Sequence, residues 1–146
     1  MPTHQITQSY STPGGALTGV TAVTADSELN IDLTLAPSAT NVLVACVITR
    51  ANIKSIGLYC TGDATIKVNS SGAPTDTIVL VAAAPNICPT QATAATLFAG
   101  TASITALYVS STAGGTFSLR ELNGKPFNFK LETLEDGRWV FTGDGI

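Results

Sequence analysis

Apolar and polar residues alternate along much of the chain. The clearest case is residues 28–35, in which leucine or isoleucine occupies every odd position from 29 to 35 and polar residues occupy the positions between. A period of two places one apolar row on a single face of a β-strand. The pattern therefore predicts a strand with one face on a hydrophobic core and the other facing water or a partner.

The stretch that turn residues divide most regularly is residues 53–81. Its three short apolar runs, 53–60, 64–69 and 77–81, are separated by Thr61-Gly62-Asp63 and by residues 70–74, which contain Gly72 and Pro74. Strand, turn, strand, turn and strand in succession predict a three-stranded β-meander.

Residues 41–50 are apolar at consecutive positions, which predicts a central strand covered on both faces. Further strands are expected at residues 16–24, 103–109 and 116–122, and only residues 90–95 have helical propensity, for one turn at most. About nine or ten short strands with almost no helix are typical of an antiparallel β-sandwich or a jelly-roll-like barrel. We expect this domain to span residues 16–122.

The two ends of the chain differ from this domain. Residues 1–15 are polar, with a possible strand at 5–10, and they form either an extended arm or a frayed terminus. Residues 123–146 begin with Asn123-Gly124, a strong hairpin signal, and contain three of the five phenylalanines and the only tryptophan. They predict an aromatic, charged β-meander that either continues the sandwich or protrudes from it.

Composition narrows the possible partners. A chain of 146 residues fits one domain, and only 12% of its residues are charged, about half the usual proportion in soluble proteins. No apolar run approaches the roughly 18 residues that a membrane span needs. A net charge of −3 without a Lys/Arg cluster argues against nucleic-acid binding. An uncharged surface suits burial against other protein subunits, although a monomer with few surface charges has the same composition.

No catalytic or metal-binding constellation is present in the sequence. His4 is the only histidine, the three cysteines are far apart, and most carboxylates fall in predicted turns. We therefore expect a non-enzymatic protein without cofactor or metal. The first residues lack the features of a secretory signal, so we expect folding in a reducing cytoplasm with free, buried thiols.

Four segments carry a resemblance to known proteins: residues 53–59, 64–80, 104–110 and 115–120. Together they resemble small virion proteins encoded among the head genes of tailed bacteriophages. The resemblance covers about half of the chain, and the sequence departs from it after Arg120. It implies a capsid decoration or cement protein that clusters at local symmetry axes as a trimer.

The leading hypothesis is therefore a virion protein, made in the host bacterial cytoplasm, that binds the major capsid protein on the outer head surface as a homo-oligomer. We expect two candidate contact regions, one in the N-terminal segment and one in the C-terminal meander: Gln5, Ile6, Tyr10 and Leu17, and Arg138, Trp139 and Phe141. The alternative is a tail- or fibre-associated module that binds host glycans, with Tyr59, Tyr108 and Trp139 stacking against sugar rings.

Overall fold

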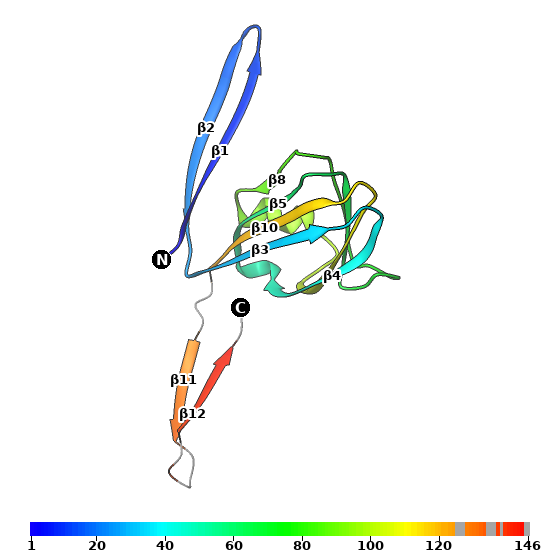
Figure 1. Cartoon of the computed structure of the whole chain (residues 1–146). Coiled ribbons are helices and arrows are strands. Elements are labelled where there is room, and N and C mark those ends of the chain that lie inside the picture. Colours follow the sequence, from blue (N-terminus) through cyan, green and yellow to red (C-terminus); the bar gives the residue numbers. More distant parts are fainter. Residues whose placement is uncertain (125–127, 134–136, 138, 145–146) are drawn as a thin grey trace.

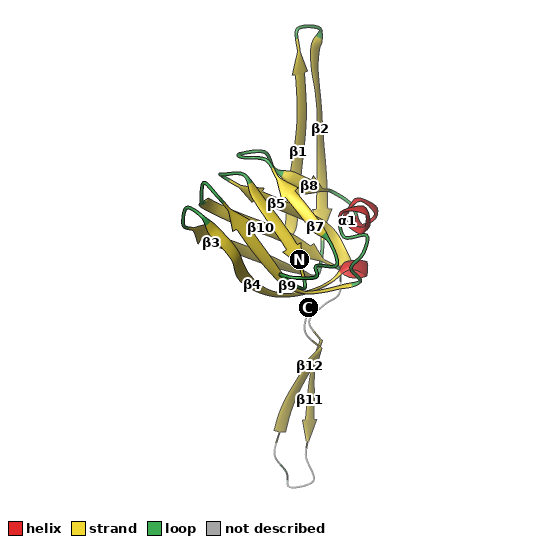
Figure 2. Cartoon of the chain, turned by 90° about the vertical axis from the view of Figure 1, so that its right-hand side faces the viewer, coloured by secondary structure: helices red, strands yellow, loops and turns green. Residues whose placement is uncertain are grey.

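Two four-stranded antiparallel sheets pack face to face as a β-sandwich (Figure 1, Figure 2). The structure is a computed structural model and describes residues 1–124, 128–133, 137 and 139–144. One sheet has the order β3 (Ser27–Leu35), β10 (Gly115–Asn123), β5 (Ile53–Cys60) and β8 (Asn86–Cys88). The other has the order β4 (Ala39–Thr49), β9 (Ser103–Ser111), β6 (Ala64–Val68) and β7 (Thr77–Leu80). The predicted all-β sandwich is confirmed.

The core lies between the two sheets and is filled by their inward rows. Phe117 and Leu119 of β10 and Ile66 of β6 are completely buried there. Burying each such side chain contributes roughly 1.5–3 kcal/mol to folding. The odd-numbered row of β3 also points inward, since Leu35 is buried and Ile31 packs against the core cluster, which confirms the facing predicted from its alternation.

The prediction of a meander at residues 53–81 is wrong. β6 and β7 do form a hairpin, but β5 lies in the opposite sheet, where its neighbours are β10 and β8. The turn at Thr61-Gly62-Asp63 therefore crosses from one sheet to the other. Alternation identifies a strand and its buried face, but it does not identify the strand's partner. The predicted meander and the observed crossing between sheets would bury the same residues.

The prediction of a central strand at residues 41–50 is also wrong, because β4 lies at the edge of its sheet. Its inward row, which includes Val44 and Ile48, is buried, whereas Leu43 and Val47 of the outward row are 56% and 58% exposed. The outward row of this strand is apolar although no other element of the described chain covers it.

One short helix, α1 (Gln91–Leu97), is longer than the single turn expected. Thr90 caps it, and Thr90 and Thr93 satisfy each other's backbone N–H groups in a capping box. A 3₁₀ turn at Arg50–Asn52 lies beside it, and the Arg50 guanidinium donates to the Phe98 carbonyl oxygen at 2.7 Å. None of the helices in the described part of the chain is long and apolar enough to cross a membrane.

Two hairpins project from the sandwich in opposite directions (Figure 1). The first consists of β1 (Thr3–Thr12) and β2 (Gly15–Thr24), which among the described residues pair only with each other, and we call it the arm. The second consists of β11 (Asn128–Thr133) and β12 (Trp139–Asp144). The described part of the C-terminal segment therefore protrudes, and its two strands form a separate sheet that does not extend either sandwich sheet.

The arm corrects the predicted domain boundary. The sequence predicts residues 16–24 as part of the sandwich, but they form the second strand of the arm, and the sandwich begins with β3. The reason is the two-residue turn Pro13-Gly14, which is followed by Gly15 at a φ of 134°. A turn this tight folds the chain straight back, so the strand after it pairs with the strand before it.

Candidate functional site

The arm has two chemically different faces. Residues directly opposite each other in an antiparallel pair share a face, so the even-numbered residues of β1 and their β2 partners form one face. Its base is half-buried against the sandwich through His4, Ile6 and Val23. Its tip carries Tyr10 paired with Leu17, and these are 68% and 74% exposed. This face thus carries apolar side chains both at its base and at its tip, with Gln8 opposite Gly19 between them, and those at the tip lie beyond the surface that the arm covers on its own sandwich.

The opposite face of the arm is dominated by hydroxyl groups. The Oγ1 atoms of Thr3 and Thr24 are 2.9 Å apart, and Ser9 Oγ lies 3.3 Å from Thr18 Oγ1. Val20, 64% exposed, is the large apolar side chain on this side. The face away from the sandwich is therefore mostly polar but uncharged.

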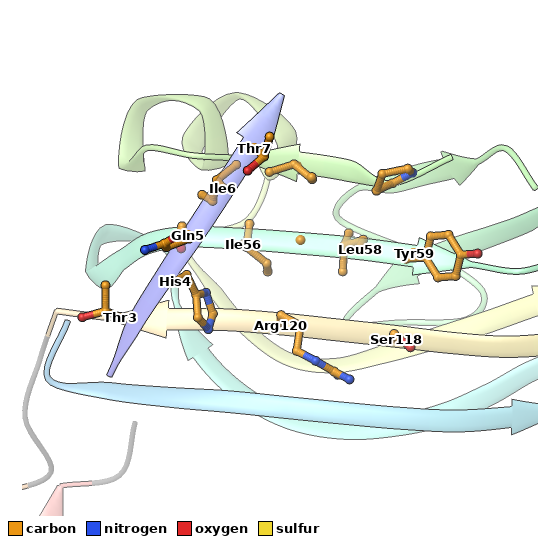
Figure 3. Close-up of a pocket in the computed structure, with 14 residues that line it drawn as sticks. Thr3, His4, Gln5, Ile6, Thr7, Ile56, Leu58, Tyr59, Ser118 and Arg120 are labelled. Carbon is orange, nitrogen blue, oxygen red and sulfur yellow. The ribbon is translucent and has the colours of Figure 1, made fainter. Parts of the chain in front are cut away.

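A hollow of about 560 Å³ lies between the base of β1 and the outer face of the β3–β10–β5–β8 sheet (Figure 3). Gly57 forms part of its floor, and a Cβ atom added there would meet nothing within 4 Å. Tyr59, Ile87 and Arg120 also line the hollow. A glycine inside a strand costs stability and often marks a place where another backbone or a ligand approaches closely. The open space above Gly57 therefore indicates such a surface.

A second hollow, of about 590 Å³, continues along Thr7, Gln8 and Ser9 and is bounded by β7, residues 84–85 and β8. Among the described residues, both hollows are lined by β1 and neither by β2. We call the two together the trough. It follows the free edge of β1 on the side where the arm overhangs the sandwich.

Arg120 and His4, which border the trough, already lie beside acidic partners. The Arg120 guanidinium donates to both carboxylate oxygens of Asp32, at 2.9 and 2.8 Å, and also to the Ile31 carbonyl oxygen at 3.0 Å. A hydrogen bond from Ser118 and the bonds from Arg120 hold the pKa of Asp32 below its ordinary value. His4 Nε2 lies 3.5 Å from a carboxylate oxygen of Glu28. The trough therefore suits an uncharged occupant.

One carboxyl group lies inside the sandwich. Glu121 is completely buried on the inward row of β10, opposite Leu29 and Ile56. Burial, the larger effect, raises its pKa to about 7, while hydrogen bonding to Asn123 partly lowers it. Its burial was not predicted from the sequence, although the alternation of Phe117, Leu119 and Glu121 places it on the inward row. It lines neither hollow of the trough, so it is placed to affect stability and not to meet a ligand.

The three cysteines are free and buried. Burial, reinforced by the nearby Glu121 carboxyl, raises the pKa of Cys46 to about 11, and burial also raises the pKa of Cys88. Neutral, enclosed thiols of this kind are poor nucleophiles and poor metal ligands. In the part of the chain that the structure describes, no three His, Cys, Asp or Glu side chains come together to hold a metal ion.

The predicted contact residues fall into two groups. Gln5 and Ile6 lie at the base of the arm and line the trough, while Tyr10 and Leu17 lie at its tip, on the face that carries Ile6. The structure thus brings these four onto one hairpin. The other group belongs to the C-terminal hairpin, where Trp139 and Phe141 lie in β12, of which only the backbone is described, and Arg138 lies outside the described residues.

The predicted sugar-stacking platform is not formed as expected. Tyr59 projects from the outer face of the β5 sheet, where Ser118 is its neighbour, whereas Tyr108 projects from the outer face of the β9 sheet beside Lys67. Inward neighbours of both residues are buried in the core between the sheets. The two rings therefore lie on opposite sides of the sandwich and cannot stack against one sugar.

No protein-family model matches the chain, and no significantly similar protein was found among either characterised proteins or solved structures. The arm and the trough are thus the features from which function can be argued.

Proposed function

We propose that this chain is a non-enzymatic structural protein that decorates the outer shell of a bacteriophage head, with the major capsid protein as its partner. The arm is the observation that carries the proposal. It contains two strands of ten residues each, and most of its side chains are exposed. A segment of this length that buries so little on its own domain is suited to reaching another protein.

Physical chemistry supports a partner for the arm. A two-stranded hairpin alone is at best marginally stable in water. The arm also keeps Tyr10, Leu17 and Val20 largely exposed, at 68%, 74% and 64%. Covering these side chains with another subunit would both stabilise the hairpin and remove apolar surface from water.

The remaining support comes from composition and sequence. Only 12% of the residues are charged, so much of the surface can be buried between subunits without desolvating ions. The resemblance of residues 53–122 to phage head proteins favours a capsid as the assembly. In that setting the protein acts by adding buried area across the seams between capsomers, which opposes the outward pressure of packaged DNA.

The proposal is tested by binding to empty capsids assembled from the major capsid protein encoded in the same genome. Full-length chain should co-sediment with these capsids, and a chain lacking residues 1–24 should remain in the supernatant. A chain lacking residues 125–146 is the matched control, since it loses the other projecting hairpin. Far-ultraviolet circular dichroism and a thermal melt establish that both truncated chains remain folded.

Two results would count against this account. If the full-length chain does not bind capsids, the decoration role is wrong. If binding survives removal of the arm but is lost with residues 125–146, the role stands and the C-terminal hairpin is the contact.

A further inference from the structure

The edges of the sandwich sheets carry the devices by which proteins avoid edge-to-edge pairing. The edge strands β7 and β8 are only four and three residues long. The edge strand β4 has two register shifts, and the edge strand β3 carries Glu28 and Asp32 on its outward row. Short strands, irregular pairing and charged side chains all discourage another chain from adding to a sheet.

The arm has none of these devices. Its register runs without interruption from Thr3 opposite Thr24 to Thr12 opposite Gly15. Between those residues there is no Asp, Glu, Lys or Arg, and the single proline is in the turn. An edge ten residues long without Asp, Glu, Lys or Arg invites another strand, and its contrast with the protected sandwich edges indicates that the arm is normally paired.

The edge of β1 differs from that of β2 because the trough lies beside it. The Ala25 N–H donates to the Pro2 carbonyl oxygen at 3.1 Å, so residue 2 belongs to a hydrogen-bonded pair. Since such pairs alternate along an antiparallel ladder, the even-numbered residues of β1 bond to β2. The odd-numbered residues, including Thr7, therefore direct their N–H and C=O groups to the open edge. A strand added there would lie over the trough.

We propose that the β1 edge and the trough form a strand-addition site, and that its occupant is β1 of a second copy of this chain, running antiparallel. The resulting contact joins two arms into a four-stranded sheet. This goes beyond attachment to a shell, because it is an interaction of the chain with itself in the absence of any capsid.

The sequence of β1 matches what the site requires of its occupant. A strand over the trough needs alternate side chains that fill an uncharged floor, with polar side chains pointing away. β1 supplies Ile6 and Tyr10 on one face, where the uncharged Gln8 lies between them, and only threonine, serine and Gln5 on the other. The floor offers the open space above Gly57 together with Ile87, and its bordering Arg120 is already bonded to Asp32.

Symmetry favours the same occupant. The outer half of the arm projects past its own sandwich (Figure 2). When two β1 strands pair antiparallel about a twofold axis, the tip of each arm lies beside the base of the other. The exposed Tyr10 of each copy then lies over the trough of its partner, so both copies gain the same contacts. Twofold pairing makes a dimer, not the trimer that the sequence resemblance implies, and it leaves β2 and the hydroxyl face for the shell.

The first test is the mass of the purified full-length chain in solution without capsids, measured by light scattering after gel filtration and by native mass spectrometry. At about 10 μM we expect a dimer, with twice the 14.9 kDa of one chain. Thr7→Pro removes an outward N–H without breaking the β1–β2 ladder, and twofold symmetry applies that loss twice. We expect it to weaken dimerisation about tenfold or more.

Val20→Pro is the matched control, because Val20 lies directly opposite Thr7 and its N–H points to the free edge of β2. It should disturb the hairpin equally but leave the dimer intact. In the trough, Gly57→Trp should weaken the dimer, because its large side chain would occupy the floor. Gly57→Ala adds only a methyl group and should leave the dimer intact. A Cβ atom at position 57 meets nothing within 4 Å, so neither substitution clashes within the chain. Single cysteines placed at positions 5 to 9 should give disulfide-linked dimers, and cysteines on β2 should not.

A monomeric wild-type chain would overturn the proposal and leave the β1 edge to a strand of the shell protein. The proposal would also be overturned if Thr7→Pro and Gly57→Trp left the dimer unchanged, or if Val20→Pro weakened it as much as Thr7→Pro does. None of these results bears on whether the chain binds capsids, so failure here is separable from failure of the decoration role.

Discussion

The buried carboxyl group of Glu121 makes stability depend on pH, and replacing it with glutamine should remove that dependence. In the unfolded chain this carboxyl titrates near its ordinary value of 4.5, whereas burial raises the folded-state pKa to about 7. Between these values the unfolded chain loses the proton while the folded chain keeps it. The free energy of unfolding therefore contains the full contribution of the protonated group below about pH 4.5, and this contribution is lost as the pH rises through about 7.

The size of the effect follows from the two pKa values. A difference of one in pKa is worth about 1.4 kcal/mol. The rise from 4.5 to about 7 thus corresponds to a loss of about 3 kcal/mol in the free energy of unfolding across this range. For a chain of this size that amounts to a fall of roughly 6–12 °C in melting temperature. The lowered pKa of Asp32 acts in a different range, because its contribution is lost only as the pH falls below about 3.8.

The assay is urea unfolding of wild type and Glu121→Gln at about pH 4.5 and about pH 8. Wild type should lose about 3 kcal/mol more than the variant between these conditions. Other titrating groups are common to both chains, so they cancel in this difference. Equal losses in the two chains would refute the burial of an ionisable Glu121 side chain in the core.

Three further outcomes follow from the packing. Ile31→Asp should lower the free energy of unfolding by at least about 2 kcal/mol, because it places a charge on the inward row of β3, while Asn30→Asp on the exposed row should change it little in a urea titration. The three buried cysteines should react with a thiol reagent only under denaturing conditions, and fast labelling of the native chain would contradict their burial. Gly62→Ala should destabilise the folded chain by about 1–3 kcal/mol, because its Cβ would collide with the Gly114 carbonyl oxygen. Gly57→Ala is the control, because a Cβ at that position meets nothing within 4 Å. Similar thermal melts for the two variants would contradict the close approach of Gly62 to Gly114.

The sandwich could be predicted because the alternation of apolar and polar residues within a strand shows which of its faces is buried. In β3 the alternation is strict, and the structure places its odd-numbered row on the core as expected. In β4 the outward row is also apolar, so the sequence could not distinguish a covered strand from an edge strand. The strands that pair with β5 could not be predicted either, because its residues have the same spacing and chemistry whichever sheet the strand joins.

The candidate site was predicted in part. The sequence predicts Tyr10 and Leu17 as contact residues, and that role stays a prediction; the pairing that brings them together depends on how the Pro13-Gly14 turn folds residues 16–24 back onto β1. The trough could not be predicted, because it arises from the way the arm overhangs a distant strand. Gly57 was the one local signal for it, a glycine inside an otherwise apolar run whose meaning depends on the space above it.

The chain is proposed to belong to a capsid shell and to be attached to it through the arm. Cryo-electron microscopy of empty capsids incubated with the full-length chain tests this most directly. We predict density for the sandwich outside the shell, joined to the major capsid protein by residues of β1 and β2. Capsids without added density, or density in which the arm projects into solvent while another part of the chain contacts the shell, would contradict the claim.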